Sequence, residues 1–313
     1  MPEPGPKPMS STSPIVTPLT KLRTYGSFVR FEHTLFSLPL LLAGIFSVPG
    51  PALAPMRWLL IAVAAVGART SAMAINRLID RRLDALNPRT RARELPAGTL
   101  KVAEAWALLA VSVAAYLIAC AELGPWYLRV SPLPLVVFAL YPWLKRFTPF
   151  CHVGVGVALA LAPLAGFAAA HPDLARPGVA LYLAAFALLW VSGFDIIYAT
   201  LDESFDREHG VHSMVAWLGR TRALQISAFL HRAAALALVP AVVGILHLVP
   251  EGPFSNLPPA VASLLLLLVV AWLLSLEQRW AENVNLAFFK VNVWVGFAVL
   301  AMVLAARSAA GFR

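Results

Sequence analysis

The hydrophobic positions of this 313-residue chain are gathered into long runs, and most polar residues lie between the runs. Nine runs have the length and apolar content of membrane-spanning helices. They cover residues 34–50, 58–79, 103–121, 131–144, 152–170, 178–199, 222–248, 259–276 and 288–306. Because backbone groups in hydrocarbon need partners within their own segment, the runs predict helices. The pattern therefore predicts an all-α, polytopic membrane helix bundle with about nine transmembrane helices.

The composition agrees with a membrane protein. Hydrophobic residues make up 59% of the chain and charged residues 13%, whereas a soluble domain has about 25% charged residues. The formal net charge is +9, but the basic residues gather in alternate loops, so no nucleic-acid partner is predicted. Residues 1–20 are rich in Pro and Ser and predict a disordered tail. Residues 21–313 predict a single transmembrane domain.

Lysine and arginine are distributed unequally between the two sides of the predicted bundle. The N-terminal segment and the loops after the second, fourth, sixth and eighth runs hold most of them: Lys21, Arg23, Arg30, Arg81, Arg82, Arg89, Arg91, Arg93, Lys101, Lys145, Arg146, Arg207, Arg220 and Arg222. The other side has Arg57, Arg129, Arg176, Arg307 and Arg313. Since basic loops remain in the cytoplasm, we predict a cytoplasmic N-terminus, with the C-terminus on the opposite face of the cell (inner) membrane.

Two acidic stretches each follow directly from a long apolar run. The first contains Asn76, Asp80 and Asp84, and the second contains Asp195, Tyr198, Asp202 and Asp206. Side chains three or four positions apart lie on one face of a helix, so each stretch forms a polar stripe at a cytoplasmic helix end. Facing carboxylate stripes repel one another unless a cation lies between them, and Mg²⁺ binds one or two protein carboxylates together with water and phosphate oxygens. The spacing therefore suggests one shared magnesium-diphosphate site.

Other interpretations of these stretches remain open on spacing alone. Their aspartates would also be explained as solvated helix ends that pair with Arg81, Arg82 and Arg207. A secondary transporter carries intramembrane acids too, although its acids lie near the bilayer midplane. A structural subunit would not need two opposed acidic stripes. Arg69, inside the second run, has either a carboxylate partner or a structural role.

The two stripes and the segments around them resemble the UbiA superfamily of intramembrane aromatic prenyltransferases. That family has an NxxxDxxxD motif in its first cytoplasmic loop and a DxxxD motif in a later one, as at residues 76–84 and 202–206. The further matching segments are Arg89-Thr90 with Leu95-Pro96-Ala97-Gly98, Tyr141-Pro142 with Lys145-Arg146, and Phe194-Asp195 with Tyr198. Two positions depart from the family pattern. Arg77 stands where many members have Asp, and Glu94 stands where Pro is usual.

The resemblance implies transfer of a polyprenyl group from a polyprenyl diphosphate to an aromatic acid at the cytoplasmic side of the membrane. The residues that would bind Mg²⁺ are Asn76, Asp80, Asp84, Asp202 and Asp206. Those that would contact the diphosphate are Lys145, Arg146 and Arg89, because cations stabilise a departing anion. Asp195 and Tyr198 are the candidates for the end of the site where the aromatic ring loses its proton, and they form the predicted catalytic set with Lys145 and Arg146. The isoprenoid chain would lie along apolar helix faces next to the lipid bilayer.

The acceptor remains open between two hydroxy-aromatic acids. The second motif resembles the branch that prenylates 4-hydroxybenzoate for ubiquinone, and also a similar branch that acts on a dihydroxynaphthoate for menaquinone. Segments 72–77 and 30–34 favour the second branch. Either acid carries a carboxylate that needs a cation in a buried site, and Arg30 and Arg69 are placed to provide one. The sequence does not determine the oligomeric state.

Overall fold

Helices make up the fold. The computed structural model describes residues 18–30, 34–50, 52–247, 257–281 and 290–309, and every regular element within these ranges is a helix. The elements are α1 (Pro18–Phe28), α2 (Thr34–Phe46), α3 (Pro55–Leu86), α4 (Val102–Leu123), α5 (Pro125–Val130), α6 (Pro132–Leu144), α7 (Cys151–Ala170), α8 (Gly178–Ala199), η2 (Thr200–Asp202), α9 (Glu203–Glu208), α10 (Met214–Leu218), α11 (Arg220–Leu246), α12 (Leu257–Arg279) and α14 (Asn292–Ala309). The predicted all-α fold is therefore confirmed. α1 begins at Pro18, a residue suited to the first helical position, so residues 18–20 of the predicted tail are helical. The rest of that tail lies outside the described residues.

Eight helical stretches of the described part are long and apolar enough to cross a membrane. They are Pro55–Leu86, Val102–Leu123, Pro125–Leu144, Cys151–Ala170, Gly178–Glu208, Arg220–Leu246, Leu257–Arg279 and Asn292–Ala309. A shorter apolar helix, Ser37–Phe46, corresponds to the first predicted run. Each of the nine predicted runs thus contains a helix, and the protein is a multi-pass membrane helix bundle.

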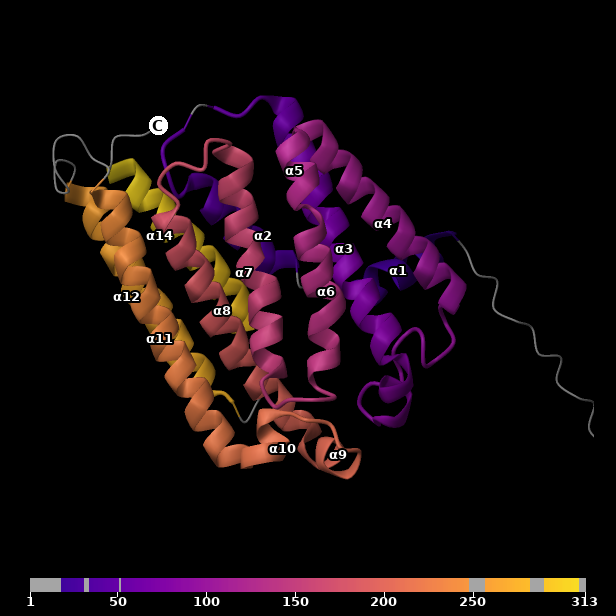
Figure 1. The fold of residues 1–313 in the computed structure, drawn as a ribbon. Helices are drawn as coiled ribbons and strands as arrows, with labels where there is room; N and C mark the ends of the chain where they lie inside the picture. Colours follow the sequence, from indigo (N-terminus) through magenta and orange to yellow (C-terminus); the bar gives the residue numbers. More distant parts are fainter. Residues whose placement is uncertain (1–17, 31–33, 51, 248–256, 282–289, 310–313) are drawn as a thin grey trace, which may run out of the picture.

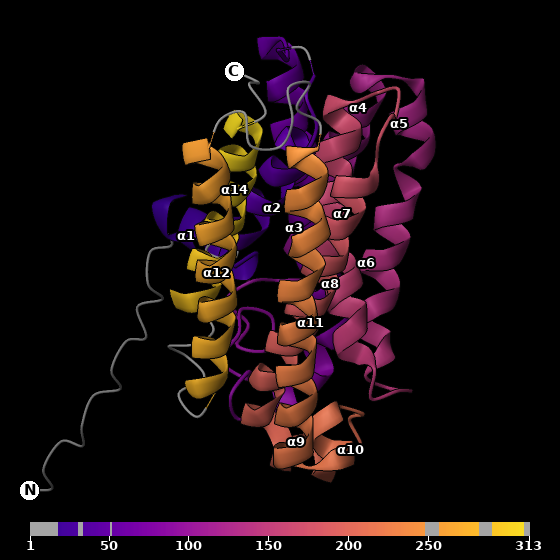
Figure 2. The same cartoon turned by 90° about the vertical axis from the view of Figure 1, so that its left-hand side faces the viewer.

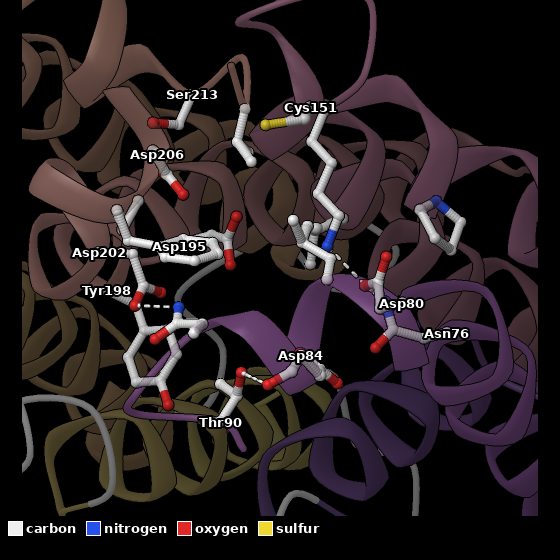
Figure 3. A pocket seen from close by; sticks show the side chains of 18 of the residues that line it. Asn76, Asp80, Asp84, Thr90, Cys151, Asp195, Tyr198, Asp202, Asp206 and Ser213 are labelled. Atoms are coloured by element: carbon white, nitrogen blue, oxygen red, sulfur yellow. Dashed lines mark hydrogen bonds and ion pairs between the residues drawn. The ribbon is translucent and has the colours of Figure 1, made fainter. Parts of the chain in front are cut away.

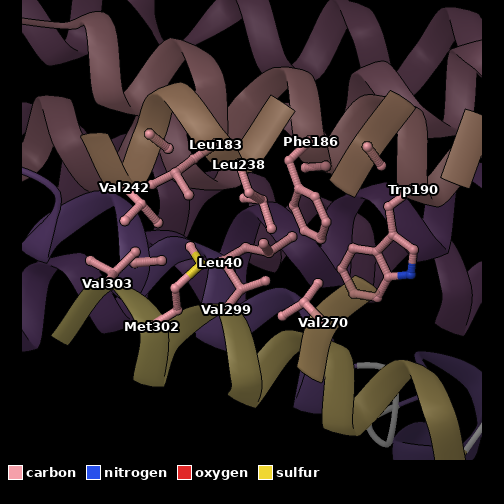
Figure 4. Packing of buried hydrophobic residues seen from close by; sticks show 14 of the residues in the cluster. Leu40, Leu183, Phe186, Trp190, Leu238, Val242, Val270, Val299, Met302 and Val303 are labelled. Carbon is pink, nitrogen blue, oxygen red and sulfur yellow. The ribbon is translucent and has the colours of Figure 1, made fainter. Parts of the chain in front are cut away.

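Six of the helices form a ring around a filled core. α7 packs against α8, α8 against α11, α11 against α12, α12 against α14, and α14 against α2, which packs in turn against α7. Large buried side chains fill the interior, and Figure 4 shows them pointing toward one another: Leu40, Leu183, Phe186, Trp190, Leu238, Val242, Val270, Val299, Met302 and Val303. Lipid is as apolar as these side chains, so close packing, and not removal from water, holds the helices together.

The ring closes where α2 and α7 approach each other at two glycines. A Cβ atom at Gly44 would lie 2.0 Å from the carbonyl oxygen of Pro163, and a Cβ atom at Gly166 would lie 2.0 Å from that of Leu41. Both obstacles are backbone atoms, so a side chain at either position would force the helices apart. Small residues at these points therefore set the position of α7, whose first turn reaches the site described below.

Four further helices, α3 to α6, lie against this ring beside α7. α6 packs against both α3 and α7, and α3 packs against α4. α1 packs against α3, where Phe28 packs with Ala74, Leu78 and Leu100. Figures 1 and 2 show α1 about halfway along the bundle. This arrangement makes α3, α6, α7 and α8 neighbours around one region of the bundle.

Both acidic stretches lie at the same end of the bundle, the lower end in Figure 1. Loop 87–101 after α3, the connection 145–150 between α6 and α7, and the short helices α9 and α10 are all at this end. α5 and the connection between α7 and α8 lie at the other end, as does the last turn of α14. The two acidic stretches therefore face the same side of the membrane.

The glycine contact predicts a stability effect. We expect Gly166→Ala to destabilise the protein by about 1–3 kcal/mol, because the added methyl group has no space beside the Leu41 carbonyl. Gly178→Ala is the matched control, since a Cβ atom there meets nothing within 4 Å. The measurement is the apparent melting temperature of each variant in detergent. Equal melting temperatures for the two variants would contradict the packing argument.

The basic loops predict the orientation. Reporter fusions after Asp84 and after Asp206 should both report the cytoplasm, and a fusion after Arg176 should report the opposite face, because the basic loops lie on the side of the acidic stretches. A fusion signal from the outer face at either aspartate would contradict this orientation.

Candidate functional site

A polar cavity opens at the end of the bundle where the acidic stretches lie. Its volume is about 210 Å³, several times the ~30 Å³ that one water molecule occupies in the liquid. Figure 3 shows α3 supplying Asn76, Asp80 and Asp84 from one side, while Asp195, Tyr198, Asp202 and Asp206 come from the other. The remaining charged and polar lining residues are Asn87, Arg89, Thr90, Arg93, Tyr141, Lys145, Cys151, His152 and Ser213. The two predicted stripes thus share one cavity.

Asp80 is buried on α3 and is held by a lysine from another helix. Its Oδ2 atom accepts hydrogen bonds from Lys145 Nζ at 2.5 Å and from Asn76 Nδ2 at 3.3 Å. Lys145 caps the C-terminal end of α6, and that position brings its side chain to α3. The other oxygen, Oδ1, is buried and has no hydrogen-bond partner in the part of the chain that the structure describes.

Asp84, one turn further along α3, repeats this arrangement with a different cation. Its Oδ1 atom accepts a hydrogen bond from Arg93 Nη1 at 2.7 Å. Thr90 Oγ1 donates to the backbone carbonyl of Asp84 at 3.0 Å and so folds loop 87–101 back onto the helix end. The buried Oδ2 atom has no partner among the described residues. The two aspartates therefore present one cation-bound oxygen and one unpartnered oxygen each.

Asp202 joins the two acidic stretches. Its carboxylate accepts hydrogen bonds from Asn87 Nδ2 at 2.8 Å and from Arg89 Nε at 2.8 Å, and Arg89 Nη2 binds its second oxygen. Arg89 Nη1 also donates to the hydroxyl of Tyr198 at 2.7 Å. Burial alone would lower the pKa of the Arg89 guanidinium, but its bonds with Asp202 and Tyr198 outweigh burial and raise that pKa. Arg89 therefore remains a cation between the two stretches.

Asp195 and Asp206 have neighbours from the segment around α10 and from α7. Asp206 is buried and lines the cavity together with Ser213. Asp195 Oδ2 lies 2.6 Å from His152 Nδ1 on the first turn of α7. His152 is absent from the predicted set. The sequence signal that could have revealed it is a polar residue at the first position of the apolar run 152–170, at the acidic end of the bundle.

Three predicted cations lie outside the cavity lining. Arg146 Nη2 donates to the Ile79 carbonyl at 3.1 Å, and its guanidinium lies 4.4 Å from the ring centroid of Trp143. The prediction that Arg146 contacts substrate beside Lys145 is thus not supported by its position, because consecutive residues at the end of α6 point in different directions. Arg30 does not line the cavity either.

Arg69 lies on α3, two turns deeper than Asn76. It does not line the cavity, but its guanidinium lies near Tyr141, which does. Its Nε atom is buried and has no hydrogen-bond partner among the described residues. A buried guanidinium without a counter-ion is costly, so Arg69 is a candidate for binding an anionic group that enters from the cavity.

Arg93, Asn87 and Ser213 also line the site and were not predicted as site residues. The alternative interpretation of the aspartates as solvated helix ends that pair with Arg81, Arg82 and Arg207 is wrong for Asp80, Asp84 and Asp202, which bind other cations. Lys145 and Arg89 come from distant segments, and Arg93 comes from the loop that follows α3. Arg81 instead binds the Leu78 carbonyl at 2.8 Å, and Arg207 binds Glu203 at 2.9 Å.

The donor set fits Mg²⁺ shared with a substrate. No three His, Cys, Asp or Glu side chains within the described ranges converge on one point, so the protein does not form a closed metal cage there. Mg²⁺ does not need such a cage, because it binds one or two carboxylates and takes the remaining ligands from water and phosphate. The unpartnered oxygens of Asp80 and Asp84 provide ligands of this kind.

The fold and the cavity define a polytopic membrane protein with a polar site of aspartates and basic side chains at one end of its helices. The family model described as the UbiA prenyltransferase family matches residues 37–296. This range covers most of the chain, and the chain belongs to the UbiA prenyltransferase family. The protein is therefore a membrane prenyltransferase, as the two acidic motifs predict, and not a secondary transporter or a structural subunit.

Individual relatives agree with this assignment. A protein of Azotobacter vinelandii named 4-hydroxybenzoate octaprenyltransferase is 31% identical over 236 residues, which are 74% of this chain and 75% of the relative. The apo structure of a UbiA homolog from Aeropyrum pernix K1 is 33% identical, covers 87% of this chain and 97% of that chain, and has a TM-score of 0.75. A UbiA homolog from Archaeoglobus fulgidus, bound to GPP and Mg²⁺, shares the fold with a TM-score of 0.63 at 16% identity, over 92% of this chain and 99% of its own.

The unpartnered oxygens predict the first mutational effect. We expect Asp80→Asn and Asp84→Asn each to lower the rate of diphosphate release from a prenyl diphosphate by about 100-fold or more, because charge stabilisation at a departing anion has this size. Asp173→Asn, in the exposed connection between α7 and α8, is the matched control and should retain the wild-type rate. A wild-type rate in the Asp80→Asn/Asp84→Asn double variant would refute the assignment.

Proposed function

We propose that this protein transfers a polyprenyl group from a polyprenyl diphosphate to a hydroxy-aromatic acid, in a reaction that depends on Mg²⁺. One observation carries the proposal: Asp80 and Asp84 each offer a buried, unpartnered oxygen beside a cation, in the same cavity as the Asp202–Arg89 pair. Basic side chains bind phosphate oxygens and carboxylates bind metal counter-ions, so a site that contains both suits a diphosphate with its counter-ions. The names of the curated relatives, which specify 4-hydroxybenzoate, support the acceptor class.

The diphosphate would occupy the space between the two acidic stretches. Lys145, Arg89 and Arg93 each bind one carboxylate, and phosphate oxygens are acceptors of the same type. The residues that would hold Mg²⁺ are Asn76, Asp80, Asp84, Asp202 and Asp206. When bound there, Mg²⁺ supplies neutralisation of the negative charge that grows on the departing diphosphate.

The transfer step needs a ring and a base close to the prenyl carbon. The bond between C1 of the prenyl group and the diphosphate oxygen breaks, and its electron pair leaves with the diphosphate. A ring carbon ortho to a hydroxyl group supplies the pair that forms the new carbon–carbon bond. The hydrogen on that ring carbon then passes as a proton to the Asp195 carboxylate, and the ring regains its aromaticity. Tyr198, bonded to Arg89, lines the same cavity as Asp195.

The carboxylate of the acceptor would bind near Arg69. A carboxylate buried without a cation costs several kcal/mol, and a buried guanidinium nitrogen without a partner is costly as well. Arg69 satisfies both requirements, since its buried Nε lacks a partner within the described chain and its neighbour Tyr141 borders the cavity. Arg30, the other predicted cation for this role, has no such contact with the cavity lining. These positions favour Arg69.

Substitution of Arg69 tests the acceptor site. We expect Arg69→Gln to raise the KM for the aromatic acid about tenfold or more while leaving the KM for the prenyl diphosphate within about twofold, since loss of one charge-assisted hydrogen bond costs about 1.5–3 kcal/mol. Arg129→Gln, an exposed arginine at the other end of the bundle, is the control. An equal change in both KM values would contradict a role specific to the acceptor.

A competition assay identifies the aromatic acid that the protein prenylates. Membranes containing the protein receive one polyprenyl diphosphate and equal amounts of 4-hydroxybenzoate and a dihydroxynaphthoate. The segments 72–77 and 30–34 favour the naphthoate, whereas the relatives' names favour 4-hydroxybenzoate. Prenylation of either acid supports the proposed function. Retention of the prenyl diphosphate with both acids present would refute it.

A further inference from the structure

His152 is bound on both ring nitrogens and lies against the candidate base of the site. Its side chain is 4% exposed, and its Nδ1 atom lies 2.6 Å from Asp195 Oδ2. On the other side of the ring, the backbone N–H of Met214 donates to Nε2 at 3.2 Å. His152 therefore connects three elements of the cavity wall: α7, α8 and the first turn of α10.

These two contacts determine which nitrogen carries the proton. Nε2 accepts from a backbone N–H, which cannot accept in return, so Nε2 carries no hydrogen. The hydrogen of the neutral imidazole is then on Nδ1, which donates it to Asp195. The contact thus defines the orientation of the Asp195 carboxylate.

The surrounding segments make this arrangement rigid. Met214 and Val215 of α10 are buried and pack with Ile196 of α8. His212 N–H donates to the Lys145 carbonyl at 2.7 Å, and the Cys151 thiol donates to the His212 carbonyl at 3.3 Å. The backbone that presents the Met214 N–H is therefore attached to the α6–α7 turn, and the imidazole cannot rotate without breaking two bonds.

We propose that His152 is a positioning residue for Asp195, and this inference rests on the proposed function. The imidazole binds Oδ2 of Asp195, a cavity-lining residue, and leaves Oδ1 as the oxygen that it does not hold. The Asp195 side chain is 26% exposed, so the carboxylate is accessible to an acceptor ring. Asp195 Oδ1 takes the proton from the ring carbon after the carbon–carbon bond forms. His152 gains no proton in this step, because its free lone pair is already used by Met214.

Two isosteric substitutions separate this role from a purely structural one. His152→Asn places an amide N–H where Nδ1 lies and keeps the bond to Asp195, while it loses the contact with Met214. His152→Gln places an amide oxygen where Nε2 lies and keeps the contact with Met214, while it loses the bond to Asp195. If His152 acts through Asp195, the Asn variant retains function; if it only anchors α10, the Gln variant does.

The readout is the ratio of prenylated product to released diphosphate. Prenyl alcohol, which forms when water captures the prenyl group, is measured as the competing product. We expect His152→Gln to lower this ratio about tenfold or more, the lower range for loss of a proton-transfer group, with the rate of diphosphate release preserved. His152→Asn should keep the ratio within about threefold of wild type. His247→Asn is the control, because His247 is an exposed histidine at the C-terminal end of α11. Asp195→Asn, which leaves the His152 and Met214 contact in place, should lower the ratio as the Gln variant does.

Three results would overturn the inference: a Gln variant that retains the ratio, an Asn variant that performs worse than the Gln variant, or an unchanged ratio in Asp195→Asn. The Asp195→Asn result tests the inference even if neither His152 variant folds. A further His152→Gln substitution in the Asp195→Asn background should have no added effect. Failure of the proposed function is distinguishable, since the wild-type protein itself would then release no diphosphate.

Discussion

A buried carboxylate at the end of a membrane helix needs a cation beside it, and this requirement organises the site. An unpaired charge in a low-dielectric region costs several kcal/mol. Asp80, Asp84 and Asp202 each meet this requirement with a cation from a connection between helices: Lys145 at the end of α6, and Arg93 and Arg89 in loop 87–101. The ion pairs therefore fold the connections between helices over the cavity, and the site and its loops form together.

This requirement also explains the division of the bundle. The ring of α2, α7, α8, α11, α12 and α14 encloses an apolar core of closely packed side chains. α3 and α6 are added outside that ring, and the cavity lies where they meet α7 and α8. α7 and α8 belong to both parts. Their packing in the ring holds His152 and Asp195 in position, while their outer faces line the cavity.

The same pairs make the site ready for an anionic substrate. A cation that binds one carboxylate oxygen has a defined position before the substrate arrives, and little reorganisation is needed when phosphate oxygens replace or share that contact. The unpartnered oxygens of Asp80 and Asp84 and the unpartnered Nε of Arg69 are costly without a ligand. Under the proposed function, the two aspartate oxygens would accept a metal, and the Arg69 Nε would donate to the carboxylate of the acceptor.

The amino-acid sequence by itself determined the helical bundle, the common end of the two acidic stretches and the family. Hydropathy and the period of the helix are local properties, so runs such as 58–79 and 178–199, and the stripe of Asn76, Asp80 and Asp84, are visible in the sequence. The tertiary structure decided which cation serves which carboxylate. Arg81 and Arg207 are near the aspartates in sequence but bind elsewhere, and Arg146 points away from the cavity while its neighbour Lys145 enters it. His152 meets Asp195, 43 positions away, only because α7 and α8 pack side by side. Pairings of this kind depend on the relative placement of helices, which the spacing of residues along the chain does not contain.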